Sequence, residues 1–499
     1  MPNSSIQALW YAGFQSENPE KFNKDFIYKR NEEEDTESIL KSIAVALEVI
    51  PNIKFTGCTL ETDESRFQDI HKIEESRLIL AVLSFHLTCE DAGTGEILQE
   101  DVSVRLFLPK IVDNFYFQLN GNRYYAIYQM IDRGTYNVNG SIGLKTMLMP
   151  FLVSKEDFDI VDTLDNVYHG RSMKLDVFKR AVNILLYFIS ESGLEETLVF
   201  FGVRQFYEFT ATTEVLADEA DKYIFFSVSK TLFLRVNKEF FEQDKWFTFT
   251  LINLLSKTKL GSFEEAQDPE FWNFQLGKIY TTNKDQAKKK AFKIHSSIRR
   301  ILDRCTIENM VHVDAKDKKS IYHIFRWILT FFEELSHEDN MDLKNKRMRL
   351  NEYILYPFIR KLSTETYRCL NTKKMTMKTL TSVFSNIKPN LCIKQLVTNE
   401  LLRYVNCVNC VDIFSSALKI TQAGPQGVAG SDNMLIRYRG HHPSYLGKIG
   451  LNAASAGDPG VTATMTPFIK TEGLFFDKTV EHKTPNEFPD VLHLVEAEI

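Results

Sequence analysis

The residues of this sequence that could catalyse a reaction do not fall into a recognisable active-site pattern. The chain has no G-x-x-x-x-G-K-[ST] phosphate loop, no G-x-G-x-x-G segment after a predicted strand, no H-E-x-x-H motif and no G-x-S-x-G elbow. It also lacks a D-x-D-x-D cluster for paired magnesium ions. Cys407 and Cys410 form a C-x-x-C pair, but zinc needs about four ligands and no second pair lies nearby. We therefore expect no catalytic residue and no metal site in this chain, which indicates a scaffold or binding part of a larger assembly.

Basic side chains that could contact phosphate groups gather in two stretches. Residues 284–300, KDQAKKKAFKIHSSIRR, hold seven Lys or Arg residues against one Asp. A solvated helix face is the favoured interpretation of this stretch, and nucleic-acid contact is the alternative. The second stretch, 343–353, places four cations within six residues: Lys344, Lys346, Arg347 and Arg349. Because the net charge of the chain is -6, any contact with DNA or RNA must rely on such local patches.

A third unusual segment is rich in glycine. Eight of the 22 glycines lie between Gly424 and Gly460. Glycine allows positive φ angles and a close approach of the backbone to another chain or ligand. A binding loop and a flexible linker are both compatible with this composition.

The remaining sequence describes an ordinary globular chain. Its 499 residues suffice for roughly two to four domains, and its 44% hydrophobic and 25% charged residues exclude a disordered or fibrous protein. Seven scattered cysteines favour a reducing compartment over a disulfide framework. The first residues do not form a signal peptide, and no run of about 18 apolar residues predicts a membrane span.

Periodicity predicts the elements that must carry these residues. Residues 84–130 alternate like an antiparallel sheet, with turns at 91–95 and at Asn120-Gly121. Two apolar stripes at helical spacing predict buried helices over 175–189 and 321–335. Their members are Leu175, Phe178, Val182, Leu185 and Ile189, and Ile321, Ile324, Phe325, Ile328, Phe332 and Leu335. His323, beside the second stripe, is expected to be a packed histidine and not a ligand.

Three separated segments give the sequence a family resemblance. Residues 109–134 resemble a segment of the β subunit of multisubunit RNA polymerases. The matching positions are Pro109, Asp113, Asn114, Phe117, Asn120, Gly121 and Gln129. Residues 339–354 are similar to a second β-subunit segment. These matches are Asp342, Leu343, Asn345, Lys346, Arg347, Arg349 and Glu352.

The third segment is the glycine-rich one, which resembles the fork loop of the β subunit and its base. Its matching positions are Gly424, Pro425, Gly427, Arg439, His442, Pro443, Tyr445, Gly447, Lys448 and Gly460. In that family the backbone here lies close to nucleic acid. The resemblance implies a nucleic-acid-binding set made of Gln129, Arg133, Lys346, Arg347, Arg349, Lys419, Arg437, Arg439, His442 and Lys448.

The resemblance implies an α+β, multidomain fold. Residues 1–150 and 336–420 would form a protrusion-like domain, and residues 151–335 a lobe-like, mostly helical domain. Residues 421–499 would form the fork loop and the start of a β core that another chain completes. Because the family continues well beyond the matched region, the chain resembles the N-terminal half of a split β subunit, an organisation typical of giant (jumbo) bacteriophages.

The same resemblance implies the partners. These are a second chain that carries the C-terminal half of the β subunit (the C-terminal β-half chain), β′-type subunits, a promoter-specificity subunit, and template DNA and RNA. No membrane partner is expected. Mg²⁺ would be held by the β′-type partner, so this chain alone would not be catalytic in nucleotidyl transfer. The host cell cytoplasm is the expected location, and the virion is a second location that the resemblance allows. A standalone nucleic-acid-binding module and a polymerase-derived structural virion protein are the alternative functions.

The segment before the Gly-Pro loop departs from the family. In the β subunit it forms the rifampicin pocket, whose polar partners are replaced here. An ungapped comparison places Asn406, Ser416, Lys419 and Thr421 at those positions, and Ser455 stands further on where the family has a Glu. The sequence therefore predicts that rifampicin binds poorly.

Overall fold

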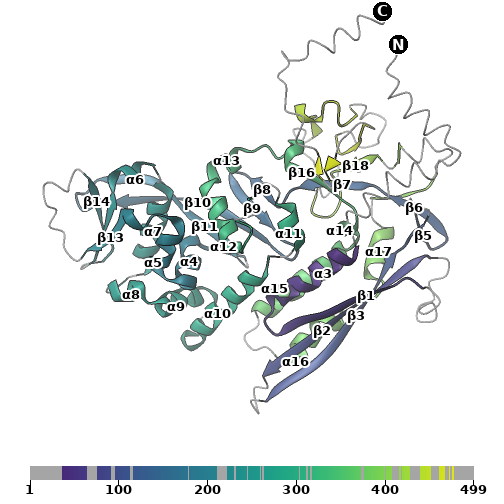
Figure 1. Ribbon diagram of the computed structural model, residues 1–499, viewed down its shortest axis with the longest axis horizontal. Coiled ribbons are helices and arrows are strands. Elements are labelled where there is room, and N and C mark those ends of the chain that lie inside the picture. Colours follow the sequence, from purple (N-terminus) through teal and green to yellow (C-terminus); the bar gives the residue numbers. More distant parts are fainter. Residues whose placement is uncertain are drawn as a thin grey trace, which may run out of the picture.

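The computed structural model describes most of the chain between residues 36 and 476. The described residues are 36–63, 76–90, 96–112, 116–177, 179–210, 222–229, 232–243, 245–258, 260, 263–281, 283–302, 304–310, 313–314, 317–371, 376–398, 401–406, 415–416, 418–427, 439–450, 460–466, 471–472 and 475–476. They form an α+β, multidomain fold in which helices surround several separate sheets (Figure 1). No helix in these ranges has both the length and the apolar character needed to cross a membrane.

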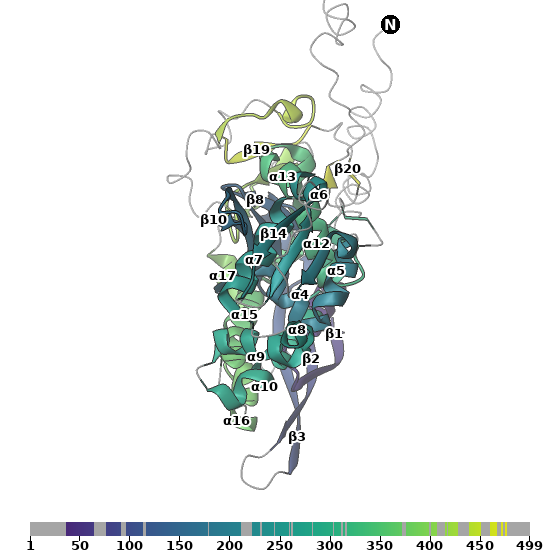
Figure 2. The same ribbon diagram turned by 90° about the vertical axis from the view of Figure 1, so that its left-hand side faces the viewer.

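A long three-stranded antiparallel sheet forms one side of the molecule. Its strands are β1 (Ile53–Glu61), β2 (Leu78–Glu90) and β3 (Ile97–Pro109). Alternate residues of β2, including Leu83, Phe85 and Leu87, point into the core, as a period of two requires. The elements that share this core are α3 (Thr36–Ala46), η1 (Leu47–Val49), α15 (Tyr356–Asn371), α16 (Met377–Ser385) and α17 (Leu391–Val397). The β2–β3 ribbon extends past the neighbouring helices (Figure 2).

A second antiparallel sheet continues from β3. Its strand order is β17 (Leu402–Tyr404), β6 (Asn122–Ala126), β5 (Tyr116–Leu119) and β4 (Ile111–Val112). Asn120 and Gly121 join β5 to β6 with φ values of 50° and 76°, so the predicted hairpin turn is confirmed. The antiparallel pairing expected for 84–130 is confirmed for β2–β3 and for β4–β5–β6, although these strands belong to two sheets and residues 128–130 enter a third, mixed sheet. The predicted turn at 91–95 lies outside the described residues.

A five-stranded antiparallel sheet follows. Its strands are β8 (Thr135–Val138), β9 (Ser141–Lys145), β10 (Pro150–Val161), β11 (Val167–Val177) and β12 (Arg180–Asn183). This pairing overturns the helix predicted over 175–189. Leu175 in β11 faces Val182 in β12, and the turn between them uses Lys179 at φ 63°. The helix, α4 (Ile184–Ser192), begins only after Asn183, whose side chain accepts a hydrogen bond from the Leu185 N–H. Phe178 lies outside the described residues.

The part of the chain after β12 is rich in helices but also contains a small sheet. The sheet strands are β13 (Tyr207–Thr210), β14 (Tyr223–Ser227) and β15 (Phe233–Asn237). The helical elements are α5 (Leu194–Phe201), η4 (Arg204–Phe206), α6 (Lys238–Gln243), α7 (Lys245–Thr258), α8 (Phe263–Gln267), α9 (Pro269–Tyr280), α10 (Lys284–Arg300), α11 (Arg304–Asn309), α12 (Ile321–Thr330) and α13 (Phe332–His337). One hydrophobic core joins these elements to β9–β12. The segment expected to be mostly helical therefore includes strands throughout its first half.

The helix predicted over 321–335 is confirmed, with a break at Phe331 between α12 and α13. Ser320 caps α12, and all six residues of the predicted stripe are buried. Nδ1 of His323 shares a hydrogen bond of 2.7 Å with the Ser320 hydroxyl. The His323 ring also packs edge-on against the Phe200 ring. The prediction of a packed histidine is confirmed.

A six-stranded mixed sheet lies at the upper right of Figure 1. Its strand order is β19 (Thr462–Thr464), β18 (Lys419–Thr421), β7 (Tyr128–Asp132), β16 (Lys346–Arg349), β21 (Phe475–Phe476) and β20 (Thr471–Glu472). The short helices next to it are η5 (Leu343–Asn345), α14 (Asn351–Ile354) and η8 (Pro443–Tyr445).

Candidate nucleic-acid interface

The central strands of the six-stranded sheet bring together segments that are far apart in sequence. Strand β7 pairs antiparallel with β16 and parallel with β18. In this register Gln129 lies between Arg349 and Thr421. The segments 109–134 and 339–354 are therefore neighbours, and the loop 424–427 begins at the end of the third strand.

Gln129 holds that loop in place. Its side chain is fully buried, and its Nε2 donates hydrogen bonds to the carbonyl oxygens of Ala423 and Pro425 at 3.0 and 3.1 Å. Its Oε1 accepts a hydrogen bond from Nε of Arg349 at 2.9 Å. One amide thus links β16 to the loop that follows β18. Gln129 therefore has a structural role, and its side chain does not reach the protein surface.

Two loop positions require glycine. Gly424 adopts a φ of 113°, which L side chains rarely adopt. A Cβ atom at Gly427 would lie 2.4 Å from the Gln422 carbonyl oxygen and 2.8 Å from Nε2 of Gln129. The close approach expected of these glycines is thus made, at least in part, to the protein itself.

Arg347 and Arg349 meet a shared carboxylate, that of Glu352. Nη2 of Arg347 lies 2.8 Å from Oε2 of Glu352, and Nη1 of Arg349 lies 3.0 Å from Oε1. Burial by itself would raise the pKa of Glu352, but the two guanidinium groups outweigh it and lower this pKa to about 2. Arg349 also donates to the side chain of Gln426 at 3.0 Å and to the Pro425 carbonyl oxygen.

This geometry gives the two arginines a structural role, and their expected contact with nucleic acid stays a prediction. Their exposed fractions are 4% and 0%. Each neutralises Glu352, and Arg349 additionally fixes the loop. Glu352 was not predicted to be their partner, although a carboxylate three residues after Arg349 was a usable signal in the sequence.

Arg133 and Lys346 are also buried in this region. Nζ of Lys346 forms an ion pair with Asp132 at 2.7 Å, and Nε of Arg133 donates to the Lys346 carbonyl oxygen at 3.5 Å. Their exposed fractions are 1% for Arg133 and 6% for Lys346. Like Arg347 and Arg349, they are buried beside the β7–β16 pair, and their expected contact with nucleic acid stays a prediction.

A comparison of the chain with protein families gives a match over most of its length. Residues 4–477 match the model of the non-virion RNA polymerase subunit family. The chain belongs to this family. A search of curated proteins found no match for it. An RNA polymerase subunit acts in a complex with other subunits and with nucleic acid.

Four of the expected contact residues of this polymerase subunit remain partly exposed: Lys419, Arg439, His442 and Lys448. Ser444 donates its backbone N–H to Nδ1 of His442 at 3.2 Å, which assigns the ring proton to Nε2, 3.6 Å from Oδ2 of Asp339. Gly460 supports the same region, because a Cβ there would lie 2.3 Å from the Arg439 carbonyl oxygen. Arg437 lies outside the described residues.

The segment compared with the rifampicin pocket is partly described. Thr421 is buried, and its Oγ1 accepts hydrogen bonds from the Ala423 N–H at 3.1 Å and from the Thr462 hydroxyl at 3.3 Å. Ser416 is buried and Asn406 is exposed. Ser455, Cys407 and Cys410 lie outside the described residues.

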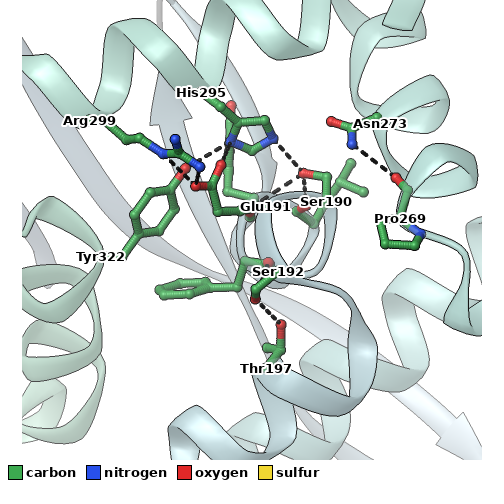
Figure 3. Close-up of polar contacts among 12 residues, drawn as sticks. Ser190, Glu191, Ser192, Thr197, Pro269, Asn273, His295, Arg299 and Tyr322 are labelled. Carbon is green, nitrogen blue, oxygen red and sulfur yellow. Dashed lines mark hydrogen bonds and ion pairs between the residues drawn. The ribbon is translucent and has the colours of Figure 1, made fainter.

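Elsewhere in the subunit, Ser190, His295 and Glu191 lie together as the members of a hydrolytic triad would (Figure 3). Ser190 Oγ lies 2.9 Å from Nε2 of His295, and Nδ1 of His295 lies 3.1 Å from Glu191. Ser190, however, donates its proton to the Leu186 carbonyl oxygen at 2.5 Å and is 1% exposed. These partners assign the ring proton to Nε2, which donates to Ser190, while Nδ1 accepts from the Tyr322 hydroxyl at 2.8 Å and Arg299 pairs with the Glu191 carboxylate.

This proton arrangement is opposite to the one that a general base needs. Burial, assisted by the charge of Arg299, lowers the pKa of His295 to about 4, so the ring is neutral at pH 7. A buried serine whose histidine donates to it cannot be activated as a nucleophile. The cluster therefore joins α4 to α10 and α12 as a structural network.

Proposed function

We propose that this chain is the N-terminal half of a split β subunit, in the polymerase of a giant bacteriophage, and that it forms one wall of the cleft for DNA and RNA. The observation that carries this proposal is that the three segments that resemble the polymerase β subunit meet around strands β7, β16 and β18. The segments are separated by more than 200 residues and by about 70 residues, so their contact does not follow from proximity in sequence. A shared ancestral β-subunit core would explain why the same three segments are both similar in sequence and joined in one sheet.

The proposal gives the buried and the half-buried residues different roles. Gln129, Arg349 and Glu352 would fix the Gly-Pro loop, because a preorganised loop costs less to order when nucleic acid binds. The partly exposed set Lys419, Arg439, His442 and Lys448 would face phosphate groups. Such contacts position a strand without reading its sequence.

The catalytic chemistry would lie outside this chain. Within the described residues, no group of three or more His, Cys, Asp or Glu side chains could hold a metal ion. In the proposed enzyme, the β′-type partner would hold Mg²⁺, and the C-terminal β-half chain would complete the β core. A promoter-specificity subunit, template DNA and RNA would be the other partners, and the host cell cytoplasm the location.

Isolation of the native complex tests the proposal. A tag on this chain should recover a C-terminal β-half chain and β′-type subunits, identified by mass spectrometry. The complex should extend RNA in the presence of magnesium, whereas the purified chain alone should not. Robust synthesis by the single chain, or recovery without large partners, would contradict the split-subunit assignment.

The basic face of α10 supports one second candidate function, a module that binds nucleic acid without partners. Lys288, Lys289, Lys293, Arg299 and Arg300 are exposed on this helix, although Lys288 and Arg299 pair with Glu270 and Glu191. If this candidate is correct, the isolated chain binds DNA tightly, and neutralising Lys289 and Lys293 weakens that binding. If the chain is instead a polymerase part, the same changes leave RNA extension by the complex unaltered.

A further inference from the structure

A pocket of about 370 Å³ lies beside the Gly-Pro loop. Strands β7, β8 and β9, helix α15 and the loop residue Gln426 provide its walls. Its polar and aromatic lining includes Tyr136, Lys145, Tyr356, Arg360, Ser363 and Gln426. A cavity of about 20 Å³ shares Lys145 and Gln426 with it and reaches Arg347 and Glu352.

The charges around this pocket are unbalanced. Its two nearby carboxylates already have cationic partners, since Asp132 pairs with Lys346 at 2.7 Å and Glu352 pairs with two arginines. Within the described part of the chain, neither the Lys145 amine nor the Arg360 guanidinium has a hydrogen-bond or ion-pair partner. Asp132 and Glu352 attract the Lys145 amine but offset only part of its repulsion, and the lining of the pocket holds two cations, Lys145 and Arg360, against one carboxylate, Asp132.

Lys145 carries the larger electrostatic cost. Burial, followed by repulsion from Arg349 and Arg347, lowers the pKa of its amine to about 8. An anion in the pocket would reduce this repulsion and keep the amine protonated. Among the described residues, Ser363 makes no side-chain hydrogen bond, and its half-buried hydroxyl adds a donor on the same wall.

The lining and the volume of the pocket suit a small ligand that carries a ring and an anionic group. Tyr136 and Tyr356 add aromatic surface, and the volume lies within the range of about 300–1,000 Å³ usual for small-molecule sites. Gly143 makes room for the Tyr136 ring, because a Cβ there would lie 2.5 Å from its Cζ atom. The aromatic wall and the cationic wall thus belong to one built cavity.

We propose that this pocket binds a phosphate-bearing ligand of about mononucleotide size, with Lys145 and Arg360 contacting the phosphate group. The phosphate belongs either to a free nucleotide or to the end of a nucleic-acid strand. Gln426 lines the pocket and hydrogen-bonds to Arg349, so occupancy is communicated to the Gly-Pro loop. The proposal does not require that the chain be half of a β subunit.

Isothermal titration of the full chain tests this proposal with three probes: ATP, inorganic pyrophosphate and a short 5′-phosphorylated single strand. Lys145→Met and Arg360→Met should each weaken phosphate binding by about tenfold or more, since each removes a charge-assisted hydrogen bond. Lys289→Met, on the exposed face of α10, is the matched control and should bind as the wild type does. Arg360 is exposed, so its replacement preserves the fold even if Lys145→Met is unstable.

The three probes distinguish the two sources of phosphate. ATP and pyrophosphate binding identifies a free nucleotide, whereas binding of the phosphorylated strand alone identifies a strand end. Raising the pH past 8 should weaken binding by the wild type but not by Lys145→Arg. Failure of all probes to bind, or equal affinity in Arg360→Met and the wild type, would overturn the proposal.

Discussion

Replacing Glu352 by Gln would remove the carboxylate that Arg347 and Arg349 share while nearly preserving the side-chain shape. The pKa of Glu352 is about 2 against an ordinary value of 4.5. At about 1.4 kcal/mol per pH unit, this difference corresponds to about 3 kcal/mol of folding free energy at neutral pH. Removing one partner of a buried ion pair typically costs about 3–5 kcal/mol, because the remaining charges stay buried. We therefore expect Glu352→Gln to lower the free energy of unfolding at pH 7 by about 3 kcal/mol.

Urea unfolding of the two proteins, followed by circular dichroism, measures this loss. Glu270→Gln is the matched control, because Glu270 also pairs with a cation, Lys288, but its side chain is 73% exposed. The free energy of unfolding of this control should fall by less than about 1 kcal/mol, because exposed ion pairs contribute little to stability.

The pH dependence of the same loss follows from the depressed pKa of Glu352. Its contribution is fully present above pH 4.5 and disappears as the pH falls toward 2, so the two proteins should converge in acid. Equal stability of Glu352→Gln and Glu270→Gln at pH 7 would refute the buried-cluster argument.

Four further outcomes follow from the structure. Gly427→Ala should accelerate hydrogen exchange in the Gly-Pro loop, whereas Gly57→Ala, with nothing within 4 Å of the new Cβ, should not change it. Because the pKa of His295 falls from 6.5 to about 4 on folding, the wild type should lose about 1.4 kcal/mol per pH unit on acidification through this window, and His295→Gln should not. If Lys419 and Lys448 contact duplex phosphates, replacing both by Ala should reduce the log–log salt slope of DNA binding by the complex by about 1.8, and an unchanged slope would place them outside the interface. The assembled polymerase should extend RNA at rifampicin concentrations that stop an ordinary bacterial enzyme, and inhibition there would show that the ungapped comparison is misplaced.

Local rules predicted the elements whose conformation depends on near neighbours. The Asn120-Gly121 turn was predictable because few other residues accept two successive positive φ angles. The helix over 321–335 was predictable because its apolar positions fit one face and Ser320 caps it. The segment 175–189 was not, because the same apolar spacing is compatible with a β-hairpin followed by a helix. Its turn residue, Lys179, gave no signal of positive φ.

At the candidate interface, residue types could be read from the sequence, but their burial could not. The sequence alone identified the three segments and the residue types that they carry. It could not separate buried from exposed cations, because Lys346, Arg347 and Arg349 look alike in a basic stretch. Their burial depends on the pairing of β16 with β7, and on the loop whose Gln426 lies 77 residues from Arg349. A carboxylate, an amide and a loop carbonyl brought close by tertiary contacts compensate the cost of burying a guanidinium, so only the tertiary structure could decide that these arginines stabilise the fold.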